Sequence, residues 1–504
     1  MSAAASFRVA TSLAGLLAFV AMGPPASAQG ARWRDWPSSR PPRPGQAARV
    51  TFPPYEMRTL ANGLRVVAVS HHEQPAVTLR LLIRAGAAQD PQVLPGVANL
   101  TAALLDQGTT SRSAQQVADT IDFIGGGLGT GAGSDLSFAN VVVMKDSFAL
   151  GLDLLSDIVR NPAFAPDEIE RQREQAISGL KVSYDDPGYV ASSVHDRLVY
   201  GFHPYGLPGG GTPESMARIT RDDLVAFHAR WFVPNNAILA IVGDVTAEEA
   251  FAGAERALGP WPRREVPLQR SPEPPEPTRR VVVVDRPGAV QTEIRLGHVA
   301  IPRKHPDYLA LDLAVRILGG EGANRLQQVL RTQRGLTYAA EADLEAFKQA
   351  GGIVGETTTR SAATGEALRA AVDEFWRLVR DPVSTQELAD AQAYLSGHFP
   401  LTVETPDAIA MQVLNALFYE LDVKELETYR ERVNAVTVDD IQRVARTYLR
   451  PGRLSIVLVG DAGVIGPQLK GAGFPEFERV ALADLDLTTA DFRRARGQGT
   501  SSAR

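Results

Sequence analysis

Two segments of this 504-residue chain repeat each other without a gap. Residues 219–244 align with residues 436–461 at a constant offset of 217, and the aligned positions share a threonine, two aspartates, a proline and a closing Val-Gly-Asp. In each copy the threonine predicts the N-cap of a helix, the proline predicts the helix exit, and the apolar run before Gly-Asp predicts a buried strand. The repeat therefore predicts a tandem duplication of one α+β domain of about 200 residues.

A proline-rich segment marks the boundary between the two predicted domains. Seven of the eighteen residues from 260 to 277 are proline, a composition that favours stiff polyproline geometry. A chain of this length also exceeds the size of one hydrophobic core. We therefore predict, in chain order, a signal peptide at 1–28, an extended proline-rich arm at 29–50, a first domain at 51–259, the linker at 260–278, a second domain at 279–485 and a disordered tail at 486–504.

The N-terminus has the pattern of a secretory signal peptide. Arg8 precedes an apolar run from Val9 to Ala21, and residues 26–28 (Ala-Ser-Ala) form a small-residue cleavage site. The run is shorter than the roughly 20 residues that span a bilayer, and no later segment is long and apolar enough to cross one. The alternative is that the segment stays uncleaved as an anchor. The signal peptide predicts an exported protein, for which the bacterial periplasm fits best. Because the chain has no cysteine, it uses no disulfide bonds, and its stability must come from burial of its core.

Composition excludes one class of partner. The formal net charge is −6, with 44% hydrophobic and 22% charged residues, which is ordinary for a globular protein. Since the mildly acidic chain has no basic stripe, we expect no nucleic-acid partner.

A short helix predicted after Gly96 has the layout of a zinc-binding helix without its ligands. Its apolar residues fall on one face, with Gly108 placed as a C-terminal cap, and Asn99 and Ala103 lie one turn apart on the other face. In H-x-x-E-H zinc enzymes two histidines and a general-base glutamate occupy the positions held here by Asn99, Ala102 and Ala103. An alanine can neither ligate zinc nor accept a proton, so this helix cannot perform that chemistry.

Several further motifs, in the same order along the chain, make it resemble the pitrilysin/insulinase family of zinc peptidases, which includes the mitochondrial processing peptidases. The resemblance implies two homologous α/β-roll domains, each a mostly antiparallel sheet backed by helices. It covers nearly the whole chain from Tyr55 to about Asp461. The motifs are Asn62-Gly-Leu-Arg-Val66, Gly96-Val-Ala, Gly108-Thr109, Phe202-His-Pro-Tyr-Gly206, Gly211-Thr-Pro-Glu-Ser215 and the two Gly-Asp strand ends.

The resemblance also locates the third zinc ligand of the family, a glutamate on a later helix. Gly179 stands at that position and Gln172 at the supporting acidic position. We therefore expect no metal in this chain, with Asn99, Ala102, Ala103 and Gly179 as degenerate positions. The triplet at 71–73 (His-His-Glu) follows a predicted strand and is interpreted as a polar turn, because adjacent strand residues point to opposite faces.

Two other features bear on peptide binding. Arg331 and Tyr338 match a family segment whose arginine and tyrosine reach the substrate from the non-zinc domain; a phenol can donate to the oxygen of a tetrahedral intermediate, and a guanidinium can bind peptide carbonyls. Without the resemblance, both would be interpreted as structural. The glycine cluster at 125–133 corresponds to the family's substrate-pairing edge strand, which implies peptide binding by Leu128, Gly129 and Thr130. A mobile glycine loop is the alternative.

The sequence therefore predicts a non-catalytic, zinc-less subunit of a heteromeric periplasmic metallopeptidase that degrades or processes extended peptides. Its partner would be a homologous H-x-x-E-H subunit that carries the zinc, while this chain needs no cofactor of its own. The alternative is a structural or scaffold protein that retains the peptidase fold without a proteolytic role. An autonomous peptidase is incompatible with the missing ligands.

Overall fold

The computed structural model describes residues 52, 54–268, 271–320 and 324–494. The predicted signal peptide and proline-rich arm lie outside these residues. Among the described helices, none combines the length and apolar character needed to cross a bilayer.

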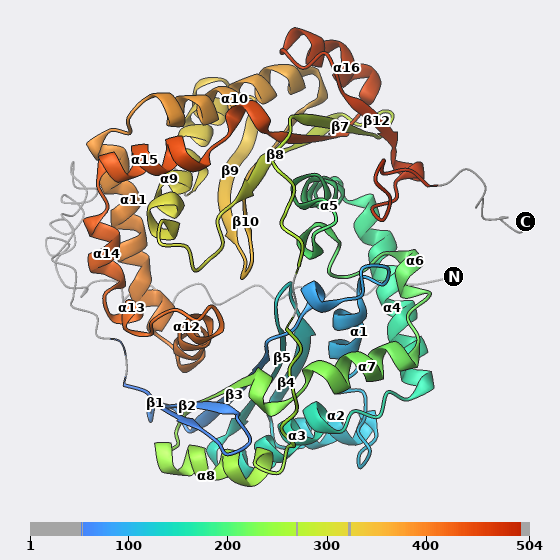
Figure 1. The fold of residues 1–504 in the computed structure, drawn as a ribbon, viewed down its shortest axis with the longest axis vertical. Helices are drawn as coiled ribbons and strands as arrows, with labels where there is room; N and C mark the ends of the chain where they lie inside the picture. Colours follow the sequence, from blue (N-terminus) through green and yellow to red (C-terminus); the bar gives the residue numbers. More distant parts are fainter. Residues whose placement is uncertain (1–51, 53, 269–270, 321–323, 495–504) are drawn as a thin grey trace, which may run out of the picture. The chain divides into compact units, whose positions relative to one another are not determined.

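Two six-stranded sheets have the same core strand order and are mostly antiparallel (Figure 1). The first runs β1 (Glu56–Thr59), β2 (Arg65–Ser70), β6 (Ala237–Gly243), β3 (Ala76–Ile83), β5 (Ser137–Met144), β4 (Gly127–Ala132). The second runs β12 (Glu478–Ala481), β7 (Arg280–Asp285), β11 (Ser455–Gly460), β8 (Gln291–Ala300), β10 (Gly351–Arg360), β9 (Thr337–Ala346). The parallel pairs are β2–β6, β7–β11 and β7–β12. Strands β4 and β9 are the equivalent edges of the two sheets.

The predicted duplication is confirmed in detail. Helix α7 (Arg221–Trp231) and helix α15 (Val438–Tyr448) differ by the offset of 217 at both ends. The side chains of Thr220 and Thr437 each accept a hydrogen bond from the backbone N–H three residues later, as N-caps do. Each helix leads through a proline-initiated turn into the central strand of its sheet, β6 or β11.

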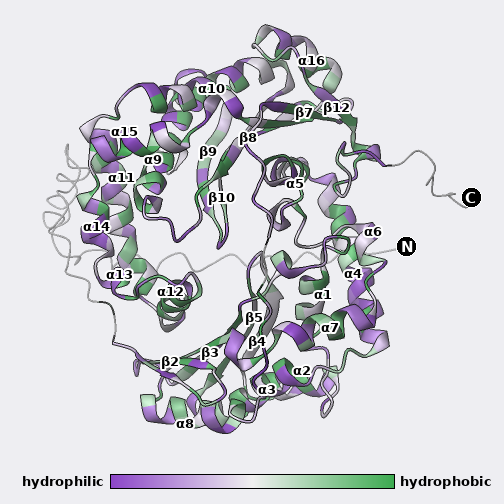
Figure 2. Ribbon diagram, viewed as in Figure 1, coloured by the Kyte–Doolittle hydropathy of each residue, from purple (hydrophilic) through white to green (hydrophobic). Residues whose placement is uncertain are grey.

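Helices cover the sheets with apolar faces turned inward. The remaining helices of the first half are α1 (Val97–Ala103), α2 (Ala114–Phe123), α3 (Phe148–Arg160), α4 (Pro166–Asp185), α5 (Pro187–Tyr200), α6 (Pro213–Met216) and α8 (Ala247–Leu258). Those of the second half are α9 (Tyr308–Gly319), the π-helix η5 (Gln327–Gln333), α10 (Thr364–Arg380), α11 (Thr385–His398), α12 (Pro406–Phe418), α13 (Lys424–Glu427), α14 (Tyr429–Ala435) and α16 (Ala462–Gly471). Helix α15 is typical: it buries Ile441, Val444 and Ala445 at helical spacing, and Figure 2 shows hydrophobic and hydrophilic residues together on it.

One helix from each half of the chain packs on the sheet of the other half. Helix α5 packs on β8 and β11 of the second sheet, where Val190 and Val194 join the apolar cluster of Val282 and Val457. Helix α12 packs on β3 and β6 of the first sheet. The offset of 217 places α12 within two residues of the position equivalent to α5. The exchanged helices are therefore copies of each other, and each completes the packing of the other half's sheet.

The chain remains packed beyond the C-terminal boundary that the sequence predicts. We expected disorder from residue 486, but the chain is packed up to Arg494. Phe492 is 1% exposed within the cluster around α5, and Leu487 is also buried there. Arg494 forms an ion pair with Glu214. Burial of these two apolar side chains offsets the entropy of ordering the segment, which corrects that boundary.

Candidate functional site

Helix α1 is held at its start by a glycine and an aspartate. Gly96 has φ +103°, a backbone conformation that residues with a Cβ rarely adopt, and a Cβ there would also lie 3.1 Å from the Gly211 Cα, so the position favours glycine. The Asp90 carboxylate accepts hydrogen bonds of 2.7 Å from the backbone N–H groups of Gly96 and Ala98. The helix ends at Ala103, with C-cap Leu104. Gly108 (φ +99°) instead lies in the turn that follows, which corrects its expected role as the helix cap.

The positions that the family resemblance equates with zinc ligands lie together on the wall of one cavity of about 720 Å³. Asn99 and Ala103 line it from α1, and Gln172 and Gly179 line it from α4. Ala102 is fully buried beneath this surface. Tertiary structure thus brings together the residues that the family resemblance singles out.

The residues now present do not fit a zinc ion. Structural and catalytic zinc sites use three or four Cys, His, Asp or Glu ligands, and none of those side chains stands at these positions. Asn99 donates a 2.7 Å hydrogen bond from Nδ2 to the carbonyl of Gly209, so it ties α1 to the loop across the cavity. A Cβ at Gly179 would meet nothing within 4 Å, so the missing side chain leaves open space. In the described part of the chain, no group of three or more His, Cys, Asp or Glu residues is arranged to hold a metal.

The histidine triplet lies in a polar turn after β2, as predicted. His72 Nδ1 is 2.6 Å from Asp244 Oδ1, and His71 Nε2 is 4.0 Å from Glu73. The side chains engage separate local partners rather than one common point.

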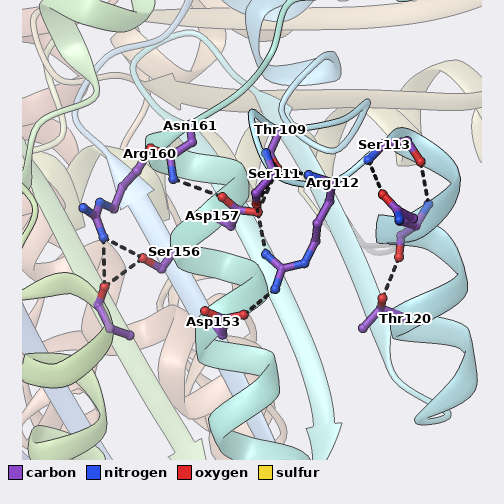
Figure 3. Close-up of polar contacts among 12 residues, drawn as sticks. Thr109, Ser111, Arg112, Ser113, Thr120, Asp153, Ser156, Asp157, Arg160 and Asn161 are labelled. Carbon is purple, nitrogen blue, oxygen red and sulfur yellow. Dashed lines mark hydrogen bonds and ion pairs between the residues drawn. The ribbon is translucent and has the colours of Figure 1, made fainter.

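A buried aspartate anchors the turn that follows α1 (Figure 3). Asp157 accepts side-chain hydrogen bonds from Thr109 (2.8 Å), Ser111 (2.9 Å), Arg112 (2.5 Å) and Asn161 (3.0 Å). Burial alone would raise the pKa of Asp157, but these hydrogen bonds together hold it below its ordinary value. The sequence reveals Gly108-Thr109 as a motif but not its partner on α3.

The cavity also contains two carboxylates that the sequence does not reveal. Asp196 lines it from α5, and Glu345 lines it from β9. Burial, together with the negative charge of Asp196, raises the pKa of Glu345 to about 7. The nearby Tyr200 is 2% exposed, and its hydroxyl has no hydrogen-bond partner among the described residues.

Arg331 and Tyr338 lie apart from this cavity and do not line it. Arg331 is on η5, and Tyr338 is the second residue of β9, 82% exposed. The Arg331 guanidinium carbon is 4.7 Å from the centroid of the Tyr338 ring. Glu345 stands seven residues further along β9, which corresponds to about 23 Å of extended chain. Strand β9 therefore contributes the exposed Tyr338 at one end and a cavity carboxylate at the other.

The glycine cluster forms an edge strand rather than a loop. In β4, Leu128, Gly129 and Thr130 pair with β5, and the other side of β4 has no strand neighbour among the described residues. A Cβ at Gly129 would meet nothing within 4 Å. The backbone of these three residues is thus placed on an open sheet edge.

Comparison with known proteins agrees with this architecture. A family model described as "Insulinase (Peptidase family M16)" matches residues 65–202, and one described as "Peptidase M16 inactive domain" matches residues 218–395. An uncharacterized zinc protease of Mycobacterium leprae is 24% identical over 84% of this chain and 94% of that protein.

Solved structures give the same assignment. The peptidase M16 inactive domain from Pseudomonas fluorescens superposes with a TM-score of 0.76 at 29% identity, covering 81% of this chain and 98% of that one. The periplasmic protease PqqL from Escherichia coli shares the fold with a TM-score of 0.71 at 16% identity, covering 86% of this chain and 51% of that one. By its fold and its sequence, the chain belongs to the insulinase family, peptidase family M16.

Proposed function

We propose that this chain is the non-catalytic, zinc-less subunit of a heteromeric metallopeptidase that degrades or processes peptides. The observation that carries the proposal is a contrast between two sites. The cavity lined by Asn99, Ala103 and Gly179 has no Cys, His, Asp or Glu at the positions that the family resemblance equates with zinc ligands. The Arg331 guanidinium carbon, by contrast, lies 4.7 Å from the Tyr338 ring centroid at the surface, away from that cavity. Because Arg331 and Tyr338 are exposed and do not line this cavity, their side chains are available to a partner subunit.

In this proposal the zinc belongs to a homologous subunit with an intact H-x-x-E-H helix and distal glutamate. The Tyr338 hydroxyl donates a hydrogen bond to the oxygen that becomes negative as the peptide bond is attacked. Arg331 holds peptide carbonyls through its guanidinium donors. An extended substrate pairs with the open edge of β4, through the backbone of Leu128, Gly129 and Thr130.

The proposed location is the periplasm. It rests on the N-terminal apolar run before the Ala-Ser-Ala site. The E. coli protein that shares the fold is itself described as periplasmic.

Reconstitution tests the proposal. The purified chain, a homologous H-x-x-E-H subunit encoded in the same genome, and their mixture are compared by gel filtration, elemental analysis and cleavage of a fluorogenic peptide. We expect no bound zinc and no cleavage from this chain alone. The mixture should form a complex with about one zinc per pair and much higher turnover than the partner alone.

Two outcomes would contradict it. Stoichiometric zinc with chelator-sensitive proteolysis by this chain alone would make it an autonomous peptidase. A stable complex in which this chain leaves the partner's turnover unchanged would support the scaffold interpretation instead.

A further inference from the structure

The cavity that stands in place of the zinc site has walls suited to a different ligand. We propose that it binds one organic cation, an ammonium or guanidinium group carried on an apolar stem. Among the described residues that line it, Asp196 and Glu345 are the only charged ones, and that set contains no Lys, Arg or His. The proposal goes beyond the supply of Arg331 and Tyr338 to a partner, and it concerns this chain alone.

The cavity wall carries two carboxylates and, among its described residues, no cationic side chain to pair with them. Neither Asp196 nor Glu345 forms a salt bridge with a lysine or arginine in the described part of the chain. The nearest ion-pair atom to Asp196 is His195 Nδ1, at 3.8 Å. Arg295, which faces Glu345, is already paired with Glu356. Glu345 is largely buried and Asp196 is 34% exposed. Since the cavity wall itself carries no cation, a bound cation would supply the counter-charge that these carboxylates lack there.

A third acceptor stands beside Glu345. Tyr200 follows Asp196 by one helical turn on α5. Its hydroxyl oxygen lies 2.7 Å from the point where a Cβ of Gly352 would be. Gly352 is the cross-strand partner of Glu345, so the missing side chain at 352 makes room for the phenol next to Glu345. The hydroxyl oxygen has no partner of its own among the described residues.

These groups match an organic cation chemically. An ammonium has three donors and no acceptor, and the two carboxylates and the phenol oxygen are three acceptors. Leu100, Leu180, Met216 and Phe347 provide apolar wall in the same cavity for the stem. The volume of about 720 Å³ is within the range of ligand pockets.

The pH response follows from the groups that face Glu345. These are Asp196 on α5, Arg295 on β8, Asp343 on β9 and Glu356 on β10. With the pKa of Glu345 at about 7, a neutral carboxyl prevails below pH 7 and a carboxylate above it. Cation binding should therefore strengthen as the pH rises from about 6 to about 8.

Isothermal titration of the full purified chain with short blocked peptides tests the site. One acetylated and amidated pentapeptide carries a central lysine, a second a central arginine, and a third a central glutamine as the neutral match. A fourth peptide, neutral in its side chains, has a free N-terminus. We expect measurable binding of at least one cationic peptide at pH 8. The glutamine peptide should bind at least about tenfold more weakly. Which of the cationic peptides binds shows whether the site recognises a side chain or a chain terminus.

Variants assign the binding to the cavity. Asp196→Asn combined with Glu345→Gln keeps the shape and removes both charges, so cationic binding should fall to the level of the glutamine peptide. Glu341→Gln, at an exposed position on β9 that does not line the cavity, is the matched control and should bind as the wild type does. Equal affinity for the lysine, arginine, N-terminal and glutamine peptides, or full cationic binding by the folded double variant, would overturn the proposal.

Discussion

The guanidinium of Arg331 lies over the ring of Tyr338, with its central carbon 4.7 Å from the ring centroid. The two residues are brought together by the end of η5 and by Gly335, whose φ of +60° reverses the chain into β9. Both side chains are exposed. This cation–π contact holds the guanidinium against the ring and leaves the phenol hydroxyl and the guanidinium N–H groups available to a partner.

Tyr338→Phe should lower the turnover of the reconstituted complex by about 10² to 10³ while leaving its assembly unchanged. The substitution removes one hydroxyl and keeps the ring that contacts Arg331. Because the lost hydrogen bond forms mainly in the transition state, the effect should appear in kcat more than in KM. Steady-state kinetics with a fluorogenic peptide measures this, and Tyr394→Phe at another exposed tyrosine is the control. Unchanged kcat would assign Tyr338 a structural role.

Arg331→Ala should raise KM as well as lower kcat, because a guanidinium that holds peptide carbonyls contacts the substrate before the reaction. The matched control is Arg334→Ala, an exposed arginine one residue beyond η5 that faces Glu366 at 3.7 Å. The same kinetic assay compares the two variants. If both alter KM equally, general surface charge rather than the Arg331 position is responsible.

Restoring ligands should restore zinc binding. Asn99→His, Ala103→His and Gly179→Glu together place three ligands on the cavity wall, and the open space at Gly179 accommodates the new side chain. We expect about one zinc per chain by elemental analysis after dialysis. A control variant with only the two histidine substitutions should retain much less zinc. Because Ala102 still provides no general base, the triple variant should remain inactive; a folded triple variant without zinc would show that the three positions no longer converge.

Glu345→Gln should stabilise the chain at pH 8 and have little effect at pH 4.5. Glu345 has a folded-state pKa of about 7 against an ordinary 4.5, so the folded state retains its proton while the unfolded state loses it. Wild-type stability therefore falls as the pH rises from 4.5 to 7, by at most about 3 kcal/mol. A glutamine side chain does not titrate, so the variant does not lose this folding stability as the pH rises. Denaturant unfolding at both pH values measures the difference, and an equal effect at both would contradict the assignment.

Asp157→Ala should destabilise the chain by about 2–4 kcal/mol, because four side-chain donors lose a common acceptor in a buried position. The control is Asp153→Ala, since Asp153 contacts the same Arg112 from an exposed position and should contribute less than about 1 kcal/mol. The depressed pKa of Asp157 also means that its contribution is present above its ordinary pKa and is lost as the pH falls through the lower, folded-state value. Thermal unfolding of the two variants at neutral pH gives the comparison, and similar losses would show that Asp157 is not the anchor.

Local patterns in the sequence account for much of the fold. The offset of 217 correctly predicts that α7 and α15 are equivalent and that each leads into a central strand, because capping residues and apolar periodicity act within a few residues. The same reasoning places Asn99 and Ala103 on one helix face. The sequence of the glycine cluster is compatible with either a strand or a loop, because glycine has little preference for either. In the folded chain this segment is a strand because it pairs with β5.

The sequence by itself determined the duplication, the residue types at Asn99, Ala103 and Gly179, and the spacing of Arg331 and Tyr338. Only the tertiary structure decided that α5 and α12 pack on each other's sheets, that Phe492 extends the ordered chain, and that Asp196 and Glu345 meet in the cavity. An apolar helix face has the same sequence pattern whichever sheet it covers, since hydrophobic burial is not directional. Side chains far apart in the chain converge only after that choice of packing partner has been made.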